Sequence, residues 1–120
     1  MNPKAFVDAI KIAVLRDAAE GTMQVLERPP GRRPASEIQE LSKWFQRLSA
    51  TDRDALAKVT KFAARQAVHN FLALLDGIAA FEPIGPKGKL ELYYVKDGSR
   101  TLLNDENAEE LTSLFKEESQ

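Results

Sequence analysis

Apolar residues are densest between Ser49 and Phe81, and their pattern changes halfway along this segment. The spacing predicts one long helix. Residues 52–65 are amphipathic and rich in charge, whereas residues 67–81 are apolar almost all round. The apolar positions of this second half are Val68, Phe71, Leu72, Leu74, Leu75, Ile78 and Phe81. A helix that is apolar on every side must be surrounded by its own domain or by a second chain. We therefore expect this helix to organise the fold.

A first helix is predicted over residues 3–19, because apolar residues recur there at helical spacing behind the favourable start Asn2-Pro3. Gly21 weakens the pattern, and the residues beyond it either continue the helix or form a short extended piece. The expected inward face consists of Phe6, Val7, Ile10, Ala13, Val14 and Ala18.

Residues 27–35 contain three prolines and a glycine, and they break the helical pattern. A second helix is predicted over residues 37–48, where Ser36 and Gln39 fit a capping box. The expected inward face consists of Ile38, Leu41, Trp44, Phe45 and Leu48. Ser49 is placed to cap the long helix, and the short connection predicts that these two helices are antiparallel neighbours.

The chain becomes extended after the long helix. A loop is predicted from its turn residues, which are Pro83, Gly85, Pro86 and Gly88. Residues 89–95 then alternate as in a strand, Asp97-Gly98 is a hairpin signal, and residues 100–103 return as a second strand. An isolated hairpin is marginal in water. We expect this one to lie on the helices or to gain a strand from another chain.

A last helix is predicted over residues 106–117, capped by Asn104 or Asp105. Its expected inward residues are Ala108, Leu111, Leu114 and Phe115. The predicted fold class is therefore α+β and mainly helical, in the order α-α-α-β-β-α. It has a long central helix and one two-stranded antiparallel hairpin, and residues 1–120 form a single domain.

Composition narrows the class of protein. The apolar and charged fractions, 43% and 29%, are typical of a soluble globular chain, and the absence of cysteine excludes disulfides and thiolate chemistry. No secretory leader or membrane-spanning run is apparent, so we expect a soluble cytoplasmic protein. The net charge of −1 does not favour nucleic acid. Three arginines among the prolines, Arg28, Arg32 and Arg33, lack the interleaved aromatic residues of a nucleic-acid surface.

The residues that are the best candidates for a catalytic role lie on the long helix. Arg65, His69 and Asp76 fall within about 40° of one another around its axis, and a histidine beside a carboxylate can act as a general base. A structural role, as part of the wet face of the helix, is the competing interpretation. Asp76-Gly77 is locally unfavourable inside an apolar helix. Asp76 either faces a pocket or accepts hydrogen bonds from a segment that approaches Gly77 closely.

A candidate partner-binding surface lies in the acidic second half of the chain. Residues 1–65 carry a net charge of +4 and residues 66–120 carry −5. Tyr93 and Tyr94 point to opposite faces of the hairpin, so one of them is available as an interface anchor. The candidate contact residues are Glu91 and Tyr93 on the hairpin, together with Glu106, Glu109 and Glu110 on the last helix.

Three stretches carry a resemblance: Leu41-Ser-Lys-Trp-Phe…Leu48-Ser-Ala-Thr-Asp-Arg53, Phe71-Leu-Ala-Leu-Leu-Asp-Gly-Ile78 and Lys89-Leu-Glu-Leu-Tyr-Tyr. They resemble a group of small bacterial proteins of unassigned function over about residues 36–115. This resemblance implies a shared fold and carries over no functional residue. In general style, as one compact domain with an acidic end and no catalytic motif, the chain also resembles the immunity proteins that neutralise bacterial toxins.

These observations together predict a bacterial protein-binding module that is not an enzyme and uses no cofactor. Its most concrete version is an immunity protein that neutralises a toxin by occlusion. One alternative is a small-molecule sensor or enzyme with a pocket around Arg65, His69 and Asp76. Another is a homo-oligomeric structural protein, such as a homodimer, that pairs residues 67–81 or the hairpin edge across a twofold axis.

Overall fold

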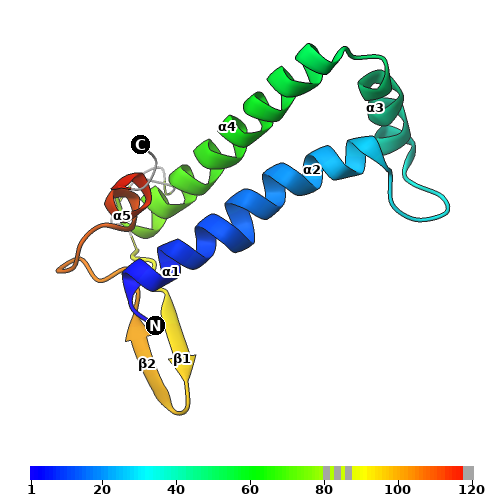
Figure 1. Ribbon diagram of the computed structural model, residues 1–120. Coiled ribbons are helices and arrows are strands. Elements are labelled where there is room, and N and C mark those ends of the chain that lie inside the picture. The colour runs from blue at the N-terminus through cyan, green and yellow to red at the C-terminus, as the bar shows by residue number, and fades with distance from the viewer. Residues whose placement is uncertain (80–81, 83–84, 86–87, 118–120) are drawn as a thin grey trace.

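Two long helical rods run antiparallel along most of the molecule (Figure 1). The computed structural model describes residues 1–79, 82, 85 and 88–117. The first rod is continuous and comprises α1 (Pro3–Ile10), the π-helical segment η1 (Lys11–Arg16) and α2 (Asp17–Glu27). Next come α3 (Ser36–Gln46) and the second rod, α4 (Ala50–Leu75), followed by β1 (Tyr93–Lys96), β2 (Ser99–Leu102) and α5 (Leu111–Glu117). The mainly helical α+β fold with one antiparallel hairpin confirms the predicted class.

The first rod is longer than the predicted helix and turns a different face inward. Asn2 Oδ1 accepts a hydrogen bond from the Ala5 amide at 2.8 Å, as a helix cap should. The helix continues to Glu27, so no extended piece follows Gly21. Val7 and Leu15 are buried, whereas Ala13, Val14 and Ala18, which were expected to face inward, are exposed. The π segment inserts an extra residue into the helical repeat. Leu15 therefore takes the inward position that uniform α-helical spacing assigns to Val14.

Helix α3 packs on α2 and meets α4 only at the corner that joins them, so the predicted antiparallel pairing of α3 with α4 is wrong (Figure 1). The capping box is also wrong in detail. Ala35 occupies the cap position without a side-chain hydrogen bond, and Gln39 Nε2 donates to the Pro34 carbonyl. Phe45 is buried, whereas Leu41 and Trp44 of the expected inward face remain 45% and 41% exposed.

Two polar side chains of α3 fix it to α2. Ser42 Oγ donates to the Leu26 carbonyl at 2.7 Å, and Gln46 Nε2 donates to the Glu27 carbonyl at 3.1 Å. The last carbonyls of a helix have no partner within it. Helix α3 therefore closes the end of α2 through its side chains.

Helix α4 begins as predicted and ends earlier than predicted. Ser49 Oγ accepts from the Asp52 amide at 3.1 Å. The helix stops at Leu75 because Gly77 takes a left-handed conformation, with φ 77°. The Ile78 amide donates to the Ala73 carbonyl and the Gly77 amide donates to the Leu74 carbonyl, which is a Schellman ending. The predicted continuation is therefore wrong for residues 76–79, and Phe81 lies outside the described residues.

The core covers one side of the second half of α4, and the expectation that this segment is surrounded is wrong for Phe71 and Ile78, which are each 59% exposed. Val68, Leu72 and Leu75 pack with Val7 and Leu15 of the first rod. Helix α5 completes this cluster with Leu111, Leu114 and Phe115. Its own chain, rather than a partner, thus covers the inward side of this half of α4.

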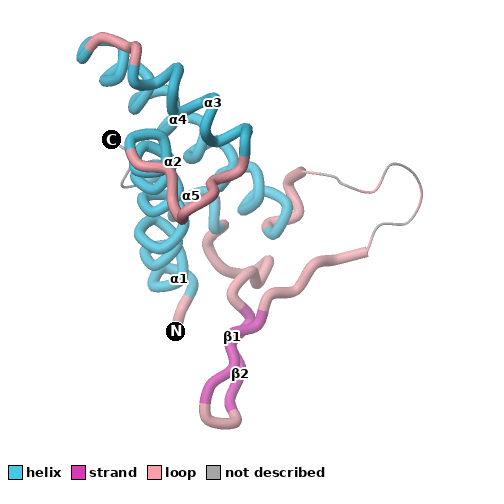
Figure 2. Tube along the Cα trace, turned by 90° about the vertical axis from the view of Figure 1, so that its right-hand side faces the viewer, coloured by secondary structure: helices cyan, strands magenta, loops and turns pink. Residues whose placement is uncertain are grey.

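The hairpin turns at Asp97-Gly98, where both residues have positive φ (51° and 78°), which is typical of a type I′ turn. The first strand is shorter than the predicted 89–95, whereas the second has the predicted length and begins one residue earlier. One further bond, from the Leu103 amide to the Leu92 carbonyl, extends the pairing beyond the strands. The hairpin projects away from the helices (Figures 1 and 2), so the expectation that it lies on them is wrong. Of the predicted loop residues, Gly85 and Gly88 are described, whereas Pro83 and Pro86 lie outside the described residues.

Helix α5 begins at Leu111 rather than at residue 106. The Asp105 side chain accepts from the Asn107 amide at 3.0 Å and so closes a turn of its own. Asn104 is engaged elsewhere in the structure. Neither of the two expected caps therefore starts the helix.

Two glycines make a matched pair for a stability test: Gly21 lies within α2, and Gly77 follows the end of α4. An added Cβ meets no atom within 4 Å at Gly21 or at Gly77, so each substitution reports backbone conformation alone. Gly77→Ala should lower the free energy of unfolding by about 1 kcal/mol, because alanine disfavours positive φ. Gly21→Ala should raise it by up to about 1 kcal/mol, because alanine favours the helix. Urea unfolding followed by circular dichroism measures both, and effects of equal sign would contradict the Schellman ending.

Candidate functional site

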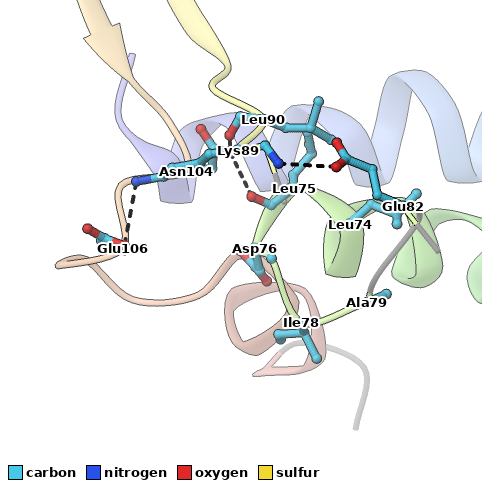
Figure 3. Close-up of a pocket in the computed structure, with 12 residues that line it drawn as sticks. Leu74, Leu75, Asp76, Ile78, Ala79, Glu82, Lys89, Leu90, Asn104 and Glu106 are labelled. Atoms are coloured by element: carbon cyan, nitrogen blue, oxygen red, sulfur yellow. Dashed lines mark hydrogen bonds and ion pairs between the residues drawn. The ribbon is translucent and has the colours of Figure 1, made fainter. Parts of the chain in front are cut away.

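The end of α4 is joined to the rest of the chain by the Asn104 side chain (Figure 3). Its Nδ2 donates to the Leu75 carbonyl at 2.6 Å and to the Leu90 carbonyl at 2.8 Å. Its Oδ1 accepts from the Leu92 amide at 2.9 Å. Asn104 is buried, so these three bonds satisfy most of its hydrogen-bonding capacity and hold the extended segment against the helix.

Asp76 forms the second part of the same joint. One of its carboxylate oxygens accepts from the Leu111 amide at 2.9 Å, and the other accepts from the Thr112 amide and hydroxyl, each at 2.9 Å. Asp76 is therefore the N-terminal cap of α5, supplied from 35 residues earlier in the chain. Of the two interpretations of this residue, acceptance of hydrogen bonds from another segment is correct. The expected close approach at Gly77 is wrong, because no atom lies within 4 Å of an added Cβ there.

A cavity of about 340 Å³ lies beside this joint. Its polar groups are already occupied, since Asn104 and Asp76 bind backbone and Lys89 Nζ lies 3.5 Å from Glu106 Oε2. Glu82 accepts from the Gly88 amide at 3.2 Å. A catalytic carboxylate needs an oxygen directed at a substrate, and both oxygens of Asp76 hold α5. The polar groups that line this cavity therefore hold the joint together.

Arg65, His69 and Asp76 do not line one common pocket. Arg65 faces a different cleft, between the two rods, while Asp76 faces the joint. His69 is half-buried, and its Nε2 is hidden from solvent without a hydrogen-bond partner among the described residues. Within the same residues, no three acidic or histidine side chains converge as metal ligands would.

The expected partner-binding residues interact with one another or with neighbouring cations. The Tyr93 hydroxyl donates to Glu91 Oε2 at 3.0 Å, and the Arg100 guanidinium lies over the Tyr93 ring, 4.2 Å from its centre. The hydrogen bond to the Glu91 carboxylate, followed by burial, raises the pKa of Tyr93, and Arg100 opposes this shift. The Tyr93 side chain is thus held in place by Glu91 and Arg100 rather than free to act as an interface anchor.

The acidic residues expected on the last helix precede it. Glu106, Glu109 and Glu110 lie in the exposed segment before α5 because Asp76, not a local residue, starts that helix. Glu106 is paired with Lys89. The expected acidic helix face is therefore an acidic loop.

An exposed apolar strip on the first half of α4 was missed by the sequence analysis. Val59 and Phe62 are each 62% exposed, and Ala55 and Ala63 beside them are exposed as well. We call these four residues the α4 strip. They fall within about 100° around the helix axis, at the spacing i, i+4, i+7 and i+8 that is typical of a buried helix face. That spacing is the signal that could have revealed the strip.

The whole chain exposes more surface than a compact monomer of its size. Its accessible area is 8776 Å², whereas a compact protein of this mass exposes about 6,500 Å². The radius of gyration is 18.3 Å, against about 14 Å for 120 residues in a compact domain. The excess, about 2,300 Å², exceeds the roughly 800 Å² that one partner contributes to a standard interface.

Comparison of the chain with protein-family models, curated proteins and solved structures finds no match. The two resemblances stated from the sequence therefore gain no support, and any functional conclusion rests on the geometry above. Among the described residues, none of the helices has both the length and the apolar character that a membrane crossing requires.

Replacing Asp76 tests the joint. Asp76→Ala removes three acceptor contacts at the start of α5, and the free energy of unfolding should fall by about 2 kcal/mol. Asp54→Ala is the matched control, because Asp54 only forms an exposed pair with Lys58 on the same helix and should cost less than about 0.5 kcal/mol. Urea unfolding followed by tryptophan fluorescence compares them, and equal costs would disprove the capping role.

The Tyr93–Glu91 contact can be tested by titration. In a Tyr94→Phe background only Tyr93 absorbs as tyrosinate, since the chain has two tyrosines. Adding Glu91→Gln should lower the pKa of Tyr93 toward its ordinary value, so the phenol should ionise at lower pH. Glu110→Gln makes an equal charge change in the acidic loop and should leave the pKa of Tyr93 unchanged. A titration that does not respond to Glu91→Gln would contradict the contact.

Proposed function

We propose that this chain is a protein-interaction module without chemistry of its own, and that it assembles with a second copy through the α4 strip. The observation that carries the proposal is the outward exposure of Val59 and Phe62 on a helix whose other half is packed into a core. Burying a side chain of this kind contributes about 1.5–3 kcal/mol. The excess exposed area leaves room for an interface of ordinary size.

The chemistry of the strip favours a second copy as its occupant. The α4 strip carries no charge, so placing it against itself across a twofold axis opposes no like charges. Lys58 beside it is paired with Asp54, 3.6 Å away on the same helix. Two antiparallel rods from each copy would then form a four-helix arrangement, which is a common way to cover a two-helix layer.

The oligomeric state tests this proposal. Light scattering of the purified protein should give twice the chain mass at micromolar concentration. Val59→Glu should weaken the dimer at least a hundredfold, or about 3 kcal/mol, because a carboxylate would be buried without a partner. Val95→Glu is the matched control, since it makes the same change at a 66% exposed hairpin residue. A monomeric wild type would overturn the proposal, and a dimer lost only in Val95→Glu would move the interface to the hairpin.

A second candidate function, neutralisation of another protein by occlusion, is favoured by the projecting hairpin. Its strands pair only with each other, and they present backbone groups that another chain can extend. Tyr93 and Glu91 lie on the same element, and the acidic loop with Glu109 and Glu110 would meet a basic partner. The specific partner that we propose for this surface is a basic toxin.

The same two variants separate this candidate from self-assembly. In a tagged pull-down with each variant, a stoichiometric partner protein should be lost with Val95→Glu and kept with Val59→Glu. His69→Gln should keep both the partner and the dimer, whereas a sensor or enzyme site at His69 would lose its activity with this change. A partner that is lost equally with Val59→Glu would contradict a separate hairpin surface.

A further inference from the structure

A cleft of about 350 Å³ lies between the first rod and α4. Its walls carry the cationic side chains Lys11, Arg16, Lys61 and Arg65, and they carry one carboxylate, Glu20. Leu15 and Phe115 give it an apolar floor. A cleft with one dominant sign of charge and low-dielectric walls concentrates the positive potential. Its volume lies within the range of small-ligand sites.

Three of the cationic side chains of the cleft are not neutralised within the described part of the chain. Arg16, Lys61 and Arg65 form no ion pair or hydrogen bond there. The Nε of Arg65 is buried and has no hydrogen-bond partner among these residues. Because this Nε is hidden from solvent, an anion bound in the cleft would meet the terminal nitrogens of the Arg65 guanidinium, which also form no hydrogen bond with the described residues.

The π-helical segment η1 is what brings the charges of the first rod together. Its hydrogen bonds include i to i+5 contacts, as from the Asp17 amide to the Ile12 carbonyl. In a uniform α-helix, Lys11 and Arg16 would point about 140° apart, yet both line this cleft. Such π segments are uncommon and are frequent at functional sites.

We propose that this cleft binds a small organic monoanion with an apolar body, such as a medium-chain carboxylate. Arg65 and Lys61 would bind the carboxylate, and Leu15 and Phe115 would contact the apolar chain. Arginine is suited to this task because its planar fork matches a carboxylate. Inorganic phosphate has no apolar body that could contact the Leu15 side of the cleft, so it should bind more weakly than the carboxylate.

The cleft and the α4 strip are formed by different residues of α4. Lys61 lies about 160° from Val59 around the α4 axis, whereas Arg65 lies about 60° from Phe62, so the two surfaces adjoin at that edge. Failure of one proposal leaves the other intact.

Isothermal titration calorimetry of the full chain with octanoate, below its micellar concentration, tests the site. Saturable binding should occur at one site per chain, and Arg65→Gln should weaken it at least about tenfold. Lys61→Gln should weaken it as well, and it provides a second readout should Arg65→Gln fail to fold by circular dichroism. Lys58→Gln removes an equal charge from the same helix outside the cleft, and it should change the affinity less than twofold. Inorganic phosphate should bind at least tenfold more weakly than octanoate.

Four results would overturn the inference. One is the absence of saturable octanoate binding. Another is octanoate binding that survives both Arg65→Gln and Lys61→Gln. The third is equal binding of neutral octanol, which would show that the apolar floor alone is recognised. Phosphate binding as tight as octanoate would overturn the assignment to a monoanion with an apolar body.

Discussion

The joints between the helices of this chain depend on satisfying the backbone groups that a helix leaves unpaired at its ends. Side chains from another element repeatedly do so. Ser42 and Gln46 close the carbonyl end of α2, and Arg53 Nη2 donates to the Gln46 carbonyl at 3.0 Å at the end of α3. Asn104 binds the end of α4, and Asp76 starts α5. In a thin, elongated molecule these polar joints set the angles between elements that a large core would otherwise set.

The consequence is an uneven distribution of packing along α4. Its second half packs on one side against η1 and α5, with Leu72 almost fully buried and Phe71 exposed. Its first half packs mainly against α2 and meets α3 at the corner through Arg53, so that two-helix layer has surfaces that the described part of the chain does not cover. One of them carries the cationic cleft and another carries the α4 strip. A helix that is half core and half surface explains why its sequence changes character in the middle.

Local signals in the sequence were reliable where the structure uses local interactions. Ser49 caps α4 and Asp97-Gly98 turns the hairpin, because each effect arises within four residues. One local signal failed, because Ser36 does not cap α3, and the other main failures involve distant partners or irregular repeats. Asp76 caps a helix 35 residues away, which no spacing rule reveals. Because of the π segment, Leu15 rather than Val14 faces inward. A uniform 3.6-residue period cannot predict that shift.

Candidate chemistry and unsatisfied interaction capacity coincide only in part on this chain. Asp76 was a catalytic candidate because it interrupts an apolar helix, yet its oxygens are fully engaged in holding α5. Arg65, which was predicted to share a pocket with His69 and Asp76, buries a donor without a partner among the described residues. Val59, which the sequence did not single out, exposes an apolar side chain. Binding gains free energy only where the free protein leaves such groups unmatched. We therefore place the proposed binding sites at residues whose contacts are incomplete rather than at residues whose types suggest catalysis.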